Sequence, residues 1–164
     1  MRTLFLFVWL ALLCAAMPHD ATAQPTVIVV RHGEKQDASP DPVLSARGDA
    51  RATRLAEMLR ATKLSATYTT ELKRTVMMAA PTAKLLGITS TALPAKDMDA
   101  LLAKIRAHGK DETVLVVGHS NTVPTILQKL GHTASVVVNE DDYDNLFVLV
   151  PNASGKPTVV PLKF

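Results

Sequence analysis

Two continuous apolar runs, residues Thr26–Arg31 and Glu112–Gly118, constrain the fold of this chain more than any other feature. Both runs are short and rich in valine, which is typical of strands that are buried on both faces. Segments with apolar residues at helical spacing lie between and after them. A strand buried on both faces requires helices on both sides of its sheet. The alternation therefore predicts an α/β fold, a three-layer α/β/α sandwich with a mostly parallel central sheet.

The remaining elements are predicted from helical spacing, caps, and glycine and proline positions. Ser45 resembles a helix N-cap, and the apolar residues that follow recur on one helical face at Ala52, Leu55, Ala56 and Leu59. Further helices are predicted from about Glu71 to Leu86, interrupted or kinked at Pro81, from Asp97 to His108, and from Asn121 to Leu130. Weaker or edge strands are predicted at Ala66–Thr70, Thr89–Leu93, Ser135–Val138, Asn145–Val150 and Thr158–Leu162.

The first residues have the pattern of a secretory signal peptide. Arg2 precedes an apolar stretch from Leu4 to Ala16, and Ala21-Thr22-Ala23 has the small residues that a signal peptidase recognises. We expect cleavage near Ala23, which would leave residues 24–164 as a single domain in the periplasm or outside the cell. Leu13 before Cys14 argues against a lipid anchor, so no stable membrane anchor is expected.

Composition narrows the classes of ligand. The formal net charge of +3 favours anionic ligands only mildly, and aromatic residues make up just 4% of the chain. Because the basic residues are dispersed and few rings could stack on bases, we expect no nucleic-acid partner. No dense spacing of His, Asp or Glu resembles a metal site, so neither a metal nor another cofactor is expected. The sequence leaves the oligomeric state open.

Two arginines and two histidines follow predicted strands. Arg31 and His32 follow the first strand, Arg74 lies just after another, and His119 directly follows Gly118. In an open α/β sheet, residues at the carboxyl ends of strands converge on one crevice. Arginine matches phosphate oxygens in pairs, and a neutral imidazole can accept a phosphoryl group covalently. The set therefore predicts a site for a phosphoryl group.

With these residues in place, the chain resembles the histidine phosphatase superfamily, also called the phosphoglycerate mutase-like family. The resemblance runs through Arg31-His32-Gly33-Glu34-Lys35, Leu44-Ser45-Ala46-Arg47-Gly48 with Arg51-Ala52, Lys73-Arg74-Thr75, and Val116-Val117-Gly118-His119-Ser120-Asn121-Thr122. It implies that His32 attacks phosphorus and becomes a phosphohistidine. Arg31 and Arg74 would hold the phosphate oxygens, and His119 would add a hydrogen bond and positive charge.

Three neighbouring residues are candidates for substrate contact. Gly33 would let the backbone turn sharply and leave room near the imidazole of His32. Asn121 would offer its amide to the phosphate or the leaving group from the start of a helix. Ser120 stands where the acid-phosphatase branch of the family places an aspartate.

The general acid is not fixed by the motifs. Glu34 is favoured because it lies closest to His32, although it could instead serve as the partner of an arginine. Asp97 and Asp142 are the other candidates. A site without an acid would suit a substrate with a good leaving group, such as a phosphohistidine or an acyl phosphate. The acidic run Glu140–Asp144 is interpreted as a solvated loop, or as one that overhangs the crevice and shapes substrate choice.

Three functions follow from this interpretation. The first is an exported, metal-independent phosphatase that acts on phosphorylated small molecules. The second is a phosphohistidine protein phosphatase, and the third is a non-catalytic module that binds phosphate. A mutase is the least favoured activity, because the chain lacks room for insertions that would enclose the substrate.

Overall fold

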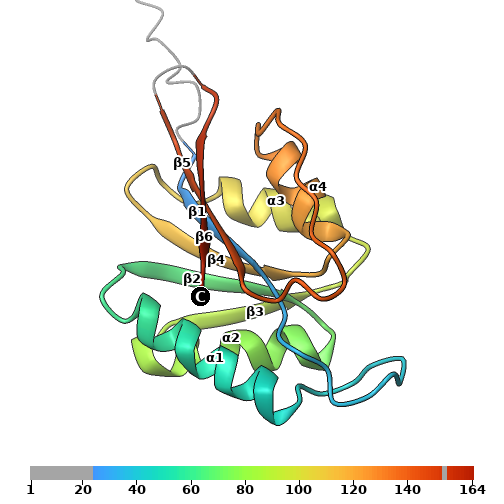
Figure 1. Cartoon of the computed structure of the whole chain (residues 1–164). Coiled ribbons are helices and arrows are strands. Elements are labelled where there is room, and N and C mark those ends of the chain that lie inside the picture. Colours follow the sequence, from blue (N-terminus) through green and yellow to red (C-terminus); the bar gives the residue numbers. More distant parts are fainter. Residues whose placement is uncertain (1–23, 153–154) are drawn as a thin grey trace, which may run out of the picture.

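The chain alternates strands and helices and then ends in two antiparallel strands (Figure 1). The computed structural model describes residues 24–152 and 155–164, so the predicted signal peptide and Cys14 lie outside the described residues. The elements in chain order are β1 (Thr26–Arg31), α1 (Ala46–Leu59), β2 (Leu64–Thr70), α2 (Lys73–Leu86), β3 (Thr89–Leu93), α3 (Met98–Arg106), β4 (Thr113–Gly118), α4 (Thr122–Lys129), β5 (Asn145–Val150) and β6 (Thr158–Lys163). The predicted α/β fold is confirmed.

The six strands form one sheet in the order β3-β2-β4-β1-β5-β6. The first four strands of that order are parallel to one another, whereas β5 and β6 pair antiparallel. The sheet is therefore mixed, and the predicted mostly parallel character holds only for its β3-β2-β4-β1 part. Only seven residues, 151–157, separate β5 from β6. Their short connection allows only antiparallel pairing.

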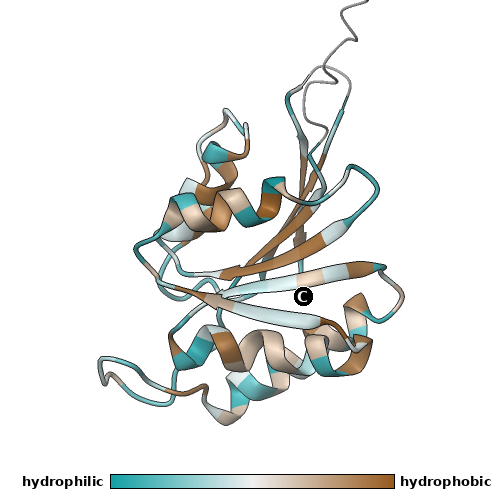
Figure 2. Ribbon diagram, turned by 180° about the vertical axis from the view of Figure 1, so that it is seen from behind, coloured by the Kyte–Doolittle hydropathy of each residue, from teal (hydrophilic) through white to brown (hydrophobic). Residues whose placement is uncertain are grey.

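Helices α1 and α2 cover one face of the sheet, and α3 and α4 cover the other (Figure 1). Alternate residues of β1 enter the two layers: Val27 and Val29 pack toward α3 and α4, and Ile28 and Val30 pack toward α1 and α2. The neighbouring strand β4 is equally apolar, whereas threonine-rich β2 is pale in the hydropathy view of Figure 2. That composition explains the weaker strand signal of β2 in the sequence.

Most predicted helix boundaries lie within about two residues of the observed ones. Ser45 is the N-cap of α1, and its Oγ accepts a hydrogen bond of 3.2 Å from the N–H of Gly48. Helix α2 starts two residues later than predicted and continues through Pro81 without a break. None of the helices in the described ranges is long and apolar enough to span a bilayer.

The prediction of a strand at Ser135–Val138 is wrong. These residues belong to an irregular segment between α4 and β5. Val138 is buried and Val136 packs against the core, whereas Val137 is 73% exposed. The alternation that resembles a strand therefore reflects packing of every second side chain, without a neighbouring strand to pair with.

The strand order brings β1 and β4 side by side in the middle of the sheet. Arg31, the last residue of β1, pairs in register with Gly118, the last residue of β4. The next residue along, His32, donates its backbone N–H to the carbonyl of Gly118 at 3.0 Å. From β1 the chain continues to β2 on one side of this pair, and from β4 it continues to β5 on the other side. Ligands of open α/β sheets bind where the connections diverge in this way.

Candidate active site

A cleft of about 350 Å³ opens at the carboxyl ends of β1 and β4. It is lined by Arg31, His32, Lys35, Leu72, Arg74, Ala95, Lys96, His119, Ser120, Asn121, Thr122 and Glu140. Six of the eight residues predicted for the site therefore lie together around one cleft. The two exceptions are Gly33 and Glu34.

His32 lines this cleft and is buried, with 3% of the residue exposed. Its Nδ1 lies 2.7 Å from the carbonyl oxygen of Gly33, which can only accept, so Nδ1 carries the hydrogen. The Nε2 atom then holds a free lone pair. Burial lowers the pKa of His32 to about 3, with smaller contributions from His119 and the nearby arginines. The ring is therefore neutral at pH 7, and burial contributes more to this than the nearby guanidinium groups do.

His119 faces His32 across the cleft, with ring centroids 5.3 Å apart and an interplanar angle of 66°. Burial and the positive charges of Arg74 and Arg31 lower the pKa of His119 to about 4. The ring is thus neutral at pH 7 in the free protein. This differs from the expected positive charge, because a buried imidazole beside two arginines binds a proton poorly.

Arg31 has only 1% of its surface exposed and is held by the loop that precedes β5. Its Nη1 donates to the backbone oxygens of Asn139 at 2.8 Å and Glu140 at 2.6 Å. Its Nη2 donates to Glu140 Oε2 at 3.0 Å, and the guanidinium carbon lies 4.2 Å from the centre of the Tyr143 ring. Arg31 therefore anchors a loop as well as lining the cleft.

Three buried donor or acceptor nitrogens around the cleft have no hydrogen-bond partner among the described residues: Arg31 Nε, Arg74 Nε and His119 Nε2. Arg74 is the second residue of α2 and is mostly buried, with Asp41 3.9 Å from its Nη1. Buried polar atoms are rarely left without partners in folded proteins. Their convergence fits a site built for an anion with several oxygens.

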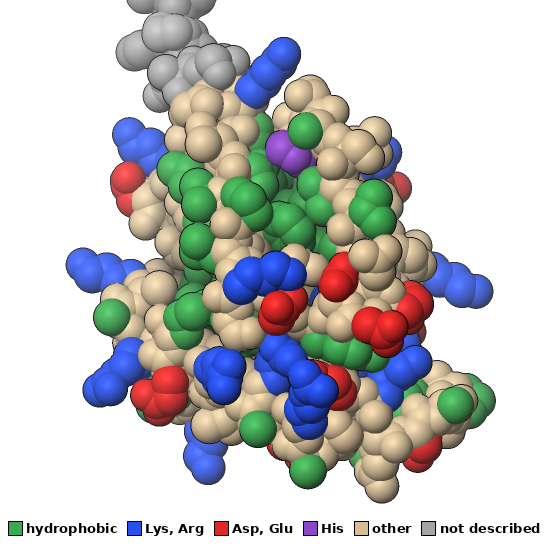
Figure 3. Space-filling view, viewed as in Figure 1, with side chains coloured by type: hydrophobic (Ala, Val, Ile, Leu, Met, Phe, Trp, Pro, Cys, Tyr) green, Lys and Arg blue, Asp and Glu red, His purple; other side chains and the backbone are tan. Residues whose placement is uncertain are grey.

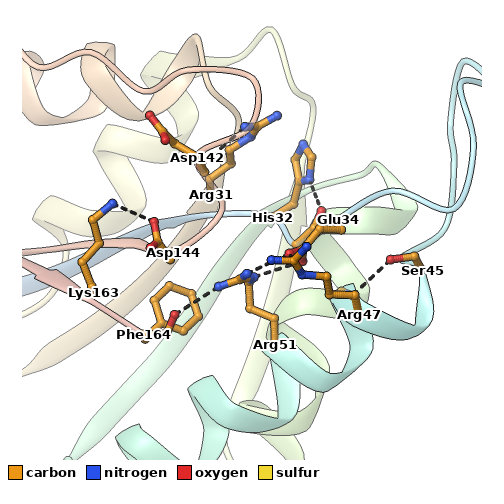
Figure 4. A network of polar contacts seen from close by, with 12 residues as sticks. Arg31, His32, Glu34, Ser45, Arg47, Arg51, Asp142, Asp144, Lys163 and Phe164 are labelled. Atoms are coloured by element: carbon orange, nitrogen blue, oxygen red, sulfur yellow. Dashed lines mark hydrogen bonds and ion pairs between the residues drawn. The ribbon is translucent and has the colours of Figure 1, made fainter.

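Glu34 does not lie in the cleft. Its carboxylate accepts from Arg51 Nε at 3.0 Å and Arg51 Nη2 at 2.7 Å, and forms an ion pair with Arg47 at 2.9 Å. Figure 4 shows this cluster beside α1, with the ring of His32 extending away from it. These arginines hold the pKa of Glu34 below its usual value. The favoured assignment of Glu34 as the general acid is therefore corrected: an ionised carboxylate fixed outside the cleft is poorly placed to protonate a leaving group.

Arg51 continues this network to the end of the chain. Its Nη1 donates to the backbone oxygen of Phe164 at 3.0 Å (Figure 4). The N–H of Phe164 in turn donates to Asp144 O. The network thus ties together the segment after β1, helix α1 and the C-terminal strand, which fixes the backbone that follows His32.

Gly33 has a packing role that differs from the expected one. It does not have a positive φ, and it does not line the cleft. A Cβ atom at Gly33 would lie 2.9 Å from the Cα of Gly48, and one at Gly48 would lie 2.4 Å from the backbone oxygen of Glu34. The two glycines let the segment after β1 pass directly against the first turn of α1, and no extra room for substrate follows from Gly33.

The other predicted acids are also engaged elsewhere. Asp97 caps α3 through a 2.9 Å hydrogen bond from Ala100 N, and lines a largely apolar cavity of about 20 Å³ that adjoins the cleft at Ala95 and Thr122. Asp142 accepts hydrogen bonds from the backbone and side chain of Asn139. The acid that does line the cleft is Glu140, which sequence reasoning missed. The only signal for it was the acidic run itself, which also fits a solvated loop.

Ser120 and Asn121 line the cleft at the start of α4, as expected from the sequence. Ser120 Oγ donates to Glu140 Oε1 at 2.5 Å, and the Asn121 side chain is exposed and makes no capping hydrogen bond.

Lysine and arginine side chains lie next to acidic ones across the middle of the face in Figure 3, so this face has no continuous basic surface. Within the described ranges, no three His, Cys, Asp or Glu residues are grouped to hold a metal ion.

Comparison with known structures shows the same fold in several proteins, two of which are described as phosphatases. YhfR from Bacillus stearothermophilus has a TM-score of 0.66 at 18% identity, covering 83% of this chain and 95% of that one. The protein histidine phosphatase SixA complexed with tungstate has a TM-score of 0.61 at 18% identity, covering 84% and 96%. A mycobacterial glucosyl-3-phosphoglycerate phosphatase complexed with VO3 has a TM-score of 0.66 at 13% identity, covering 85% and 98%.

Sequence comparison gives a narrower match. No curated protein matches this sequence significantly. The family model described as histidine phosphatase superfamily (branch 1) matches residues 27–96, the segment that contains Arg31, His32 and Arg74. This segment supplies seven of the twelve residues that line the cleft, so the match to the histidine phosphatase superfamily (branch 1) covers the part of the chain that holds His32 and both arginines.

Proposed function

We propose that this protein is a phosphatase that hydrolyses phosphomonoesters of small molecules through a phosphohistidine intermediate on His32. One observation carries the proposal: a buried, neutral His32 has its Nδ1 hydrogen directed to Gly33 O, in a cleft where Arg31 Nε, Arg74 Nε and His119 Nε2 are buried without a partner among the described residues. A neutral imidazole with one free lone pair is a nucleophile, and the surrounding donors match a phosphoryl group.

The proposed reaction has two steps. In the first, His32 Nε2 forms a bond to phosphorus while the bond to the ester oxygen breaks. In the second, water attacks phosphorus, the bond to Nε2 breaks and inorganic phosphate leaves. Arg74 and the Nε–Nη2 edge of Arg31 would hold the phosphoryl oxygens, and His119 would contribute one hydrogen bond. Ser120 and Asn121 would contact the phosphate or the leaving group at the start of α4.

The similar structures support this chemistry. Two of them are complexed with tungstate or VO3, oxyanions of the same general kind as phosphate. The corresponding proteins are described as a protein histidine phosphatase and a glucosyl-3-phosphoglycerate phosphatase. Members of one fold thus act on both protein and small-molecule phosphates, and the chemistry of this cleft must decide between them.

A phosphohistidine protein phosphatase is the second candidate. It is favoured by the finding that Glu34, Asp97 and Asp142 all lie outside the cleft. A phosphoramidate has a better leaving group than an alkyl phosphate and depends less on a carboxylic acid. Activity against phosphohistidine but not against alkyl phosphates would support this second function.

We further propose that the enzyme acts outside the cytoplasm, after cleavage near Ala23, and that it needs no metal ion. The signal pattern at residues 1–23 supports export. Arg31 and Arg74 would provide the positive charge that a metal supplies in other phosphatases.

The central test is to trap the intermediate. Brief mixing with a substrate labelled in its phosphoryl group should leave label on the protein that is labile in acid and stable in alkali. The His32→Ala variant should lose both label and turnover. His132→Ala is a matched control, because His132 follows α4 outside the cleft. Label that remains in His32→Ala contradicts the assignment, and phosphate binding without turnover in the wild type supports the non-catalytic module instead.

A further inference from the structure

The cleft contains one carboxylate among the described residues that line it, and it belongs to Glu140. Its Oε1 accepts from Ser120 Oγ at 2.5 Å, and its Oε2 accepts from Arg31 Nη2 at 3.0 Å. The carboxylate therefore joins the end of β1 to the segment that follows β4, directly beside the two histidines. Its side chain is nevertheless 73% exposed, so it can exchange a proton with solvent.

The backbone of Glu140 is anchored independently of its carboxylate. Arg31 Nη1 binds the backbone oxygens of Asn139 and Glu140, and the Arg31 guanidinium stacks against Tyr143. If the carboxylate leaves Nη2, these contacts still hold the loop at the cleft. Glu140 can thus change partners while remaining within reach of a bound ligand.

The carboxylate occupies a donor that a phosphoryl group would need. Arg31 binds paired oxygens best through two parallel N–H groups. Its Nε has no partner in the part of the chain that the structure describes, whereas its Nη2 is taken by Glu140. A phosphoryl group bound along this edge would displace Oε2. The displaced carboxylate would lose a positive partner and gain a negative neighbour, and both changes favour uptake of a proton.

We propose that Glu140 is the proton carrier of the reaction, an inference that rests on the proposed phosphatase function. In the first step, the N–P bond to His32 forms, the P–O bond to the leaving group breaks, and the Glu140 proton moves to the leaving oxygen. In the second step, water forms a bond to phosphorus, the N–P bond breaks, and the proton lost by water returns to Glu140. His32 and Glu140 are restored, and an alcohol and inorganic phosphate are the products.

The charges around Glu140 fit a carboxylate that is ionised until substrate arrives. Glu140 faces the charged or titratable groups of Arg31, His32, Lys35 and His119, and the hydroxyl of Ser120. On its own loop it is followed by Asp141 and Asp142. The hydrogen bond from Ser120 and the charges of Arg31 and Lys35 hold the pKa of Glu140 below its usual value in the free protein. When substrate displaces the Glu140 carboxylate from Arg31 Nη2, the effect of Arg31 on the pKa of Glu140 weakens. This happens at the step in which Glu140 must hold a proton.

The test compares Glu140→Gln with the wild type on substrates that differ only in the leaving group. Glutamine keeps the size of the side chain and can still accept from Ser120, but it cannot carry the proton. We expect kcat/KM, which reports the first step, to fall at least about a hundredfold for an alkyl phosphate such as ethyl phosphate, with less than about threefold change for p-nitrophenyl phosphate, whose leaving group needs little protonation. Asp141→Asn is the matched control, since it removes the same charge from the next residue of the loop and is outside the cleft lining. It should change neither rate more than about twofold.

Three outcomes overturn the inference: equal losses on both substrates, no loss on either, or a similar selective loss in Asp141→Asn. Equal losses would show that Glu140 only positions Arg31. Failure of the proposed function itself is distinguishable, because the wild type would then form no phosphohistidine and would release no phosphate from p-nitrophenyl phosphate. A melting temperature of Glu140→Gln close to that of the wild type establishes that its rates report chemistry rather than unfolding.

Discussion

The rings of His32 and His119 lie 5.3 Å apart because the strands that precede them, β1 and β4, are hydrogen-bonded neighbours. The pairing of Arg31 with Gly118 places the two histidines at the same level of the sheet, and the hydrogen bond from His32 N to Gly118 O fixes that level. Both rings are consequently buried together beside two arginines. The strand register thus determines their protonation as well as their position.

Because both rings are buried and neutral, we expect the unfolding free energy of the protein to decrease in acid. An unfolded histidine has a pKa near 6.5, whereas folding lowers the pKa of His32 to about 3 and of His119 to about 4. Below pH 6.5 the unfolded chain therefore binds protons that the folded chain excludes, and stability falls as the pH falls from about 6.5 to about 4. At pH 4.5, two pH units at about 1.4 kcal/mol each give a loss of about 2 to 3 kcal/mol per histidine.

Urea unfolding at pH 7.0 and pH 4.5 tests this prediction. The difference in unfolding free energy between the two pH values should be smaller in His32→Gln and in His119→Gln than in the wild type. Each variant is compared with itself, so a general effect of the substitution on stability cancels. Variants that lose as much stability in acid as the wild type would contradict the neutral, buried state of both rings.

Glu34→Gln should act on stability and not on leaving-group chemistry. Its carboxylate is 14% exposed and is held by Arg47 and Arg51, so weakening these contacts should cost about 1 to 3 kcal/mol of unfolding free energy. Turnover of ethyl phosphate and p-nitrophenyl phosphate should change by the same factor. Asp49→Asn, at an exposed position in the first turn of α1, is the charge-matched control. A loss confined to the alkyl substrate would restore Glu34 as the acid.

The sequence predicted the parallel part of the fold and the convergence of the motif residues because those signals are local. Buried strands are apolar throughout, and residues at their carboxyl ends meet wherever strands are adjacent. The pairing of Glu34 with Arg51 was harder to predict from the sequence, because a glutamate two residues after His32 can face either the cleft or α1. Only the close passage of Gly33 against Gly48 directs it toward Arg51.

Glu140 could not be identified for a different reason. Its place at the cleft depends on Arg31, which lies far away in the sequence and uses both terminal nitrogens to hold the 139–142 segment. An arginine was expected to bind only phosphate, so its role in anchoring a loop was missed. The supposed strand at Ser135–Val138 was wrong on similar grounds, because local alternation does not show whether a neighbouring strand exists.

Gly48→Ala should disturb the site through packing alone. The added Cβ would lie 2.4 Å from the Glu34 backbone oxygen, so the backbone after His32 must shift. We expect a loss of about 1 to 3 kcal/mol in unfolding free energy, measured by denaturant titration. At Gly109 an added Cβ would meet only Glu112 Oε2 at 3.6 Å, which makes Gly109→Ala the control. Equal stability of Gly48→Ala and the wild type would contradict the tight contact between this segment and α1.

Activity should survive removal of metal ions, because the proposed phosphoryl site draws its positive charge from Arg31 and Arg74. Phosphate release from p-nitrophenyl phosphate should be unchanged after treatment with EDTA and dialysis. An enzyme that is inactivated by the chelator and restored by a divalent metal ion would refute the metal-independent mechanism.

Arg74→Lys should weaken the phosphate clamp for every substrate. Arg74 Nε is buried without a hydrogen-bond partner among the described residues, and the guanidinium lines the cleft from the first turn of α2. Lysine keeps the positive charge but loses the paired donors that match two phosphoryl oxygens. We expect turnover to fall at least about tenfold, or roughly 1.4 kcal/mol, on aryl and alkyl phosphates alike. Arg54→Lys, at an exposed position on α1, should leave turnover unchanged. A loss in Arg74→Lys that depends on the leaving group would instead place Arg74 at the ester oxygen, and full activity would remove it from the phosphoryl site.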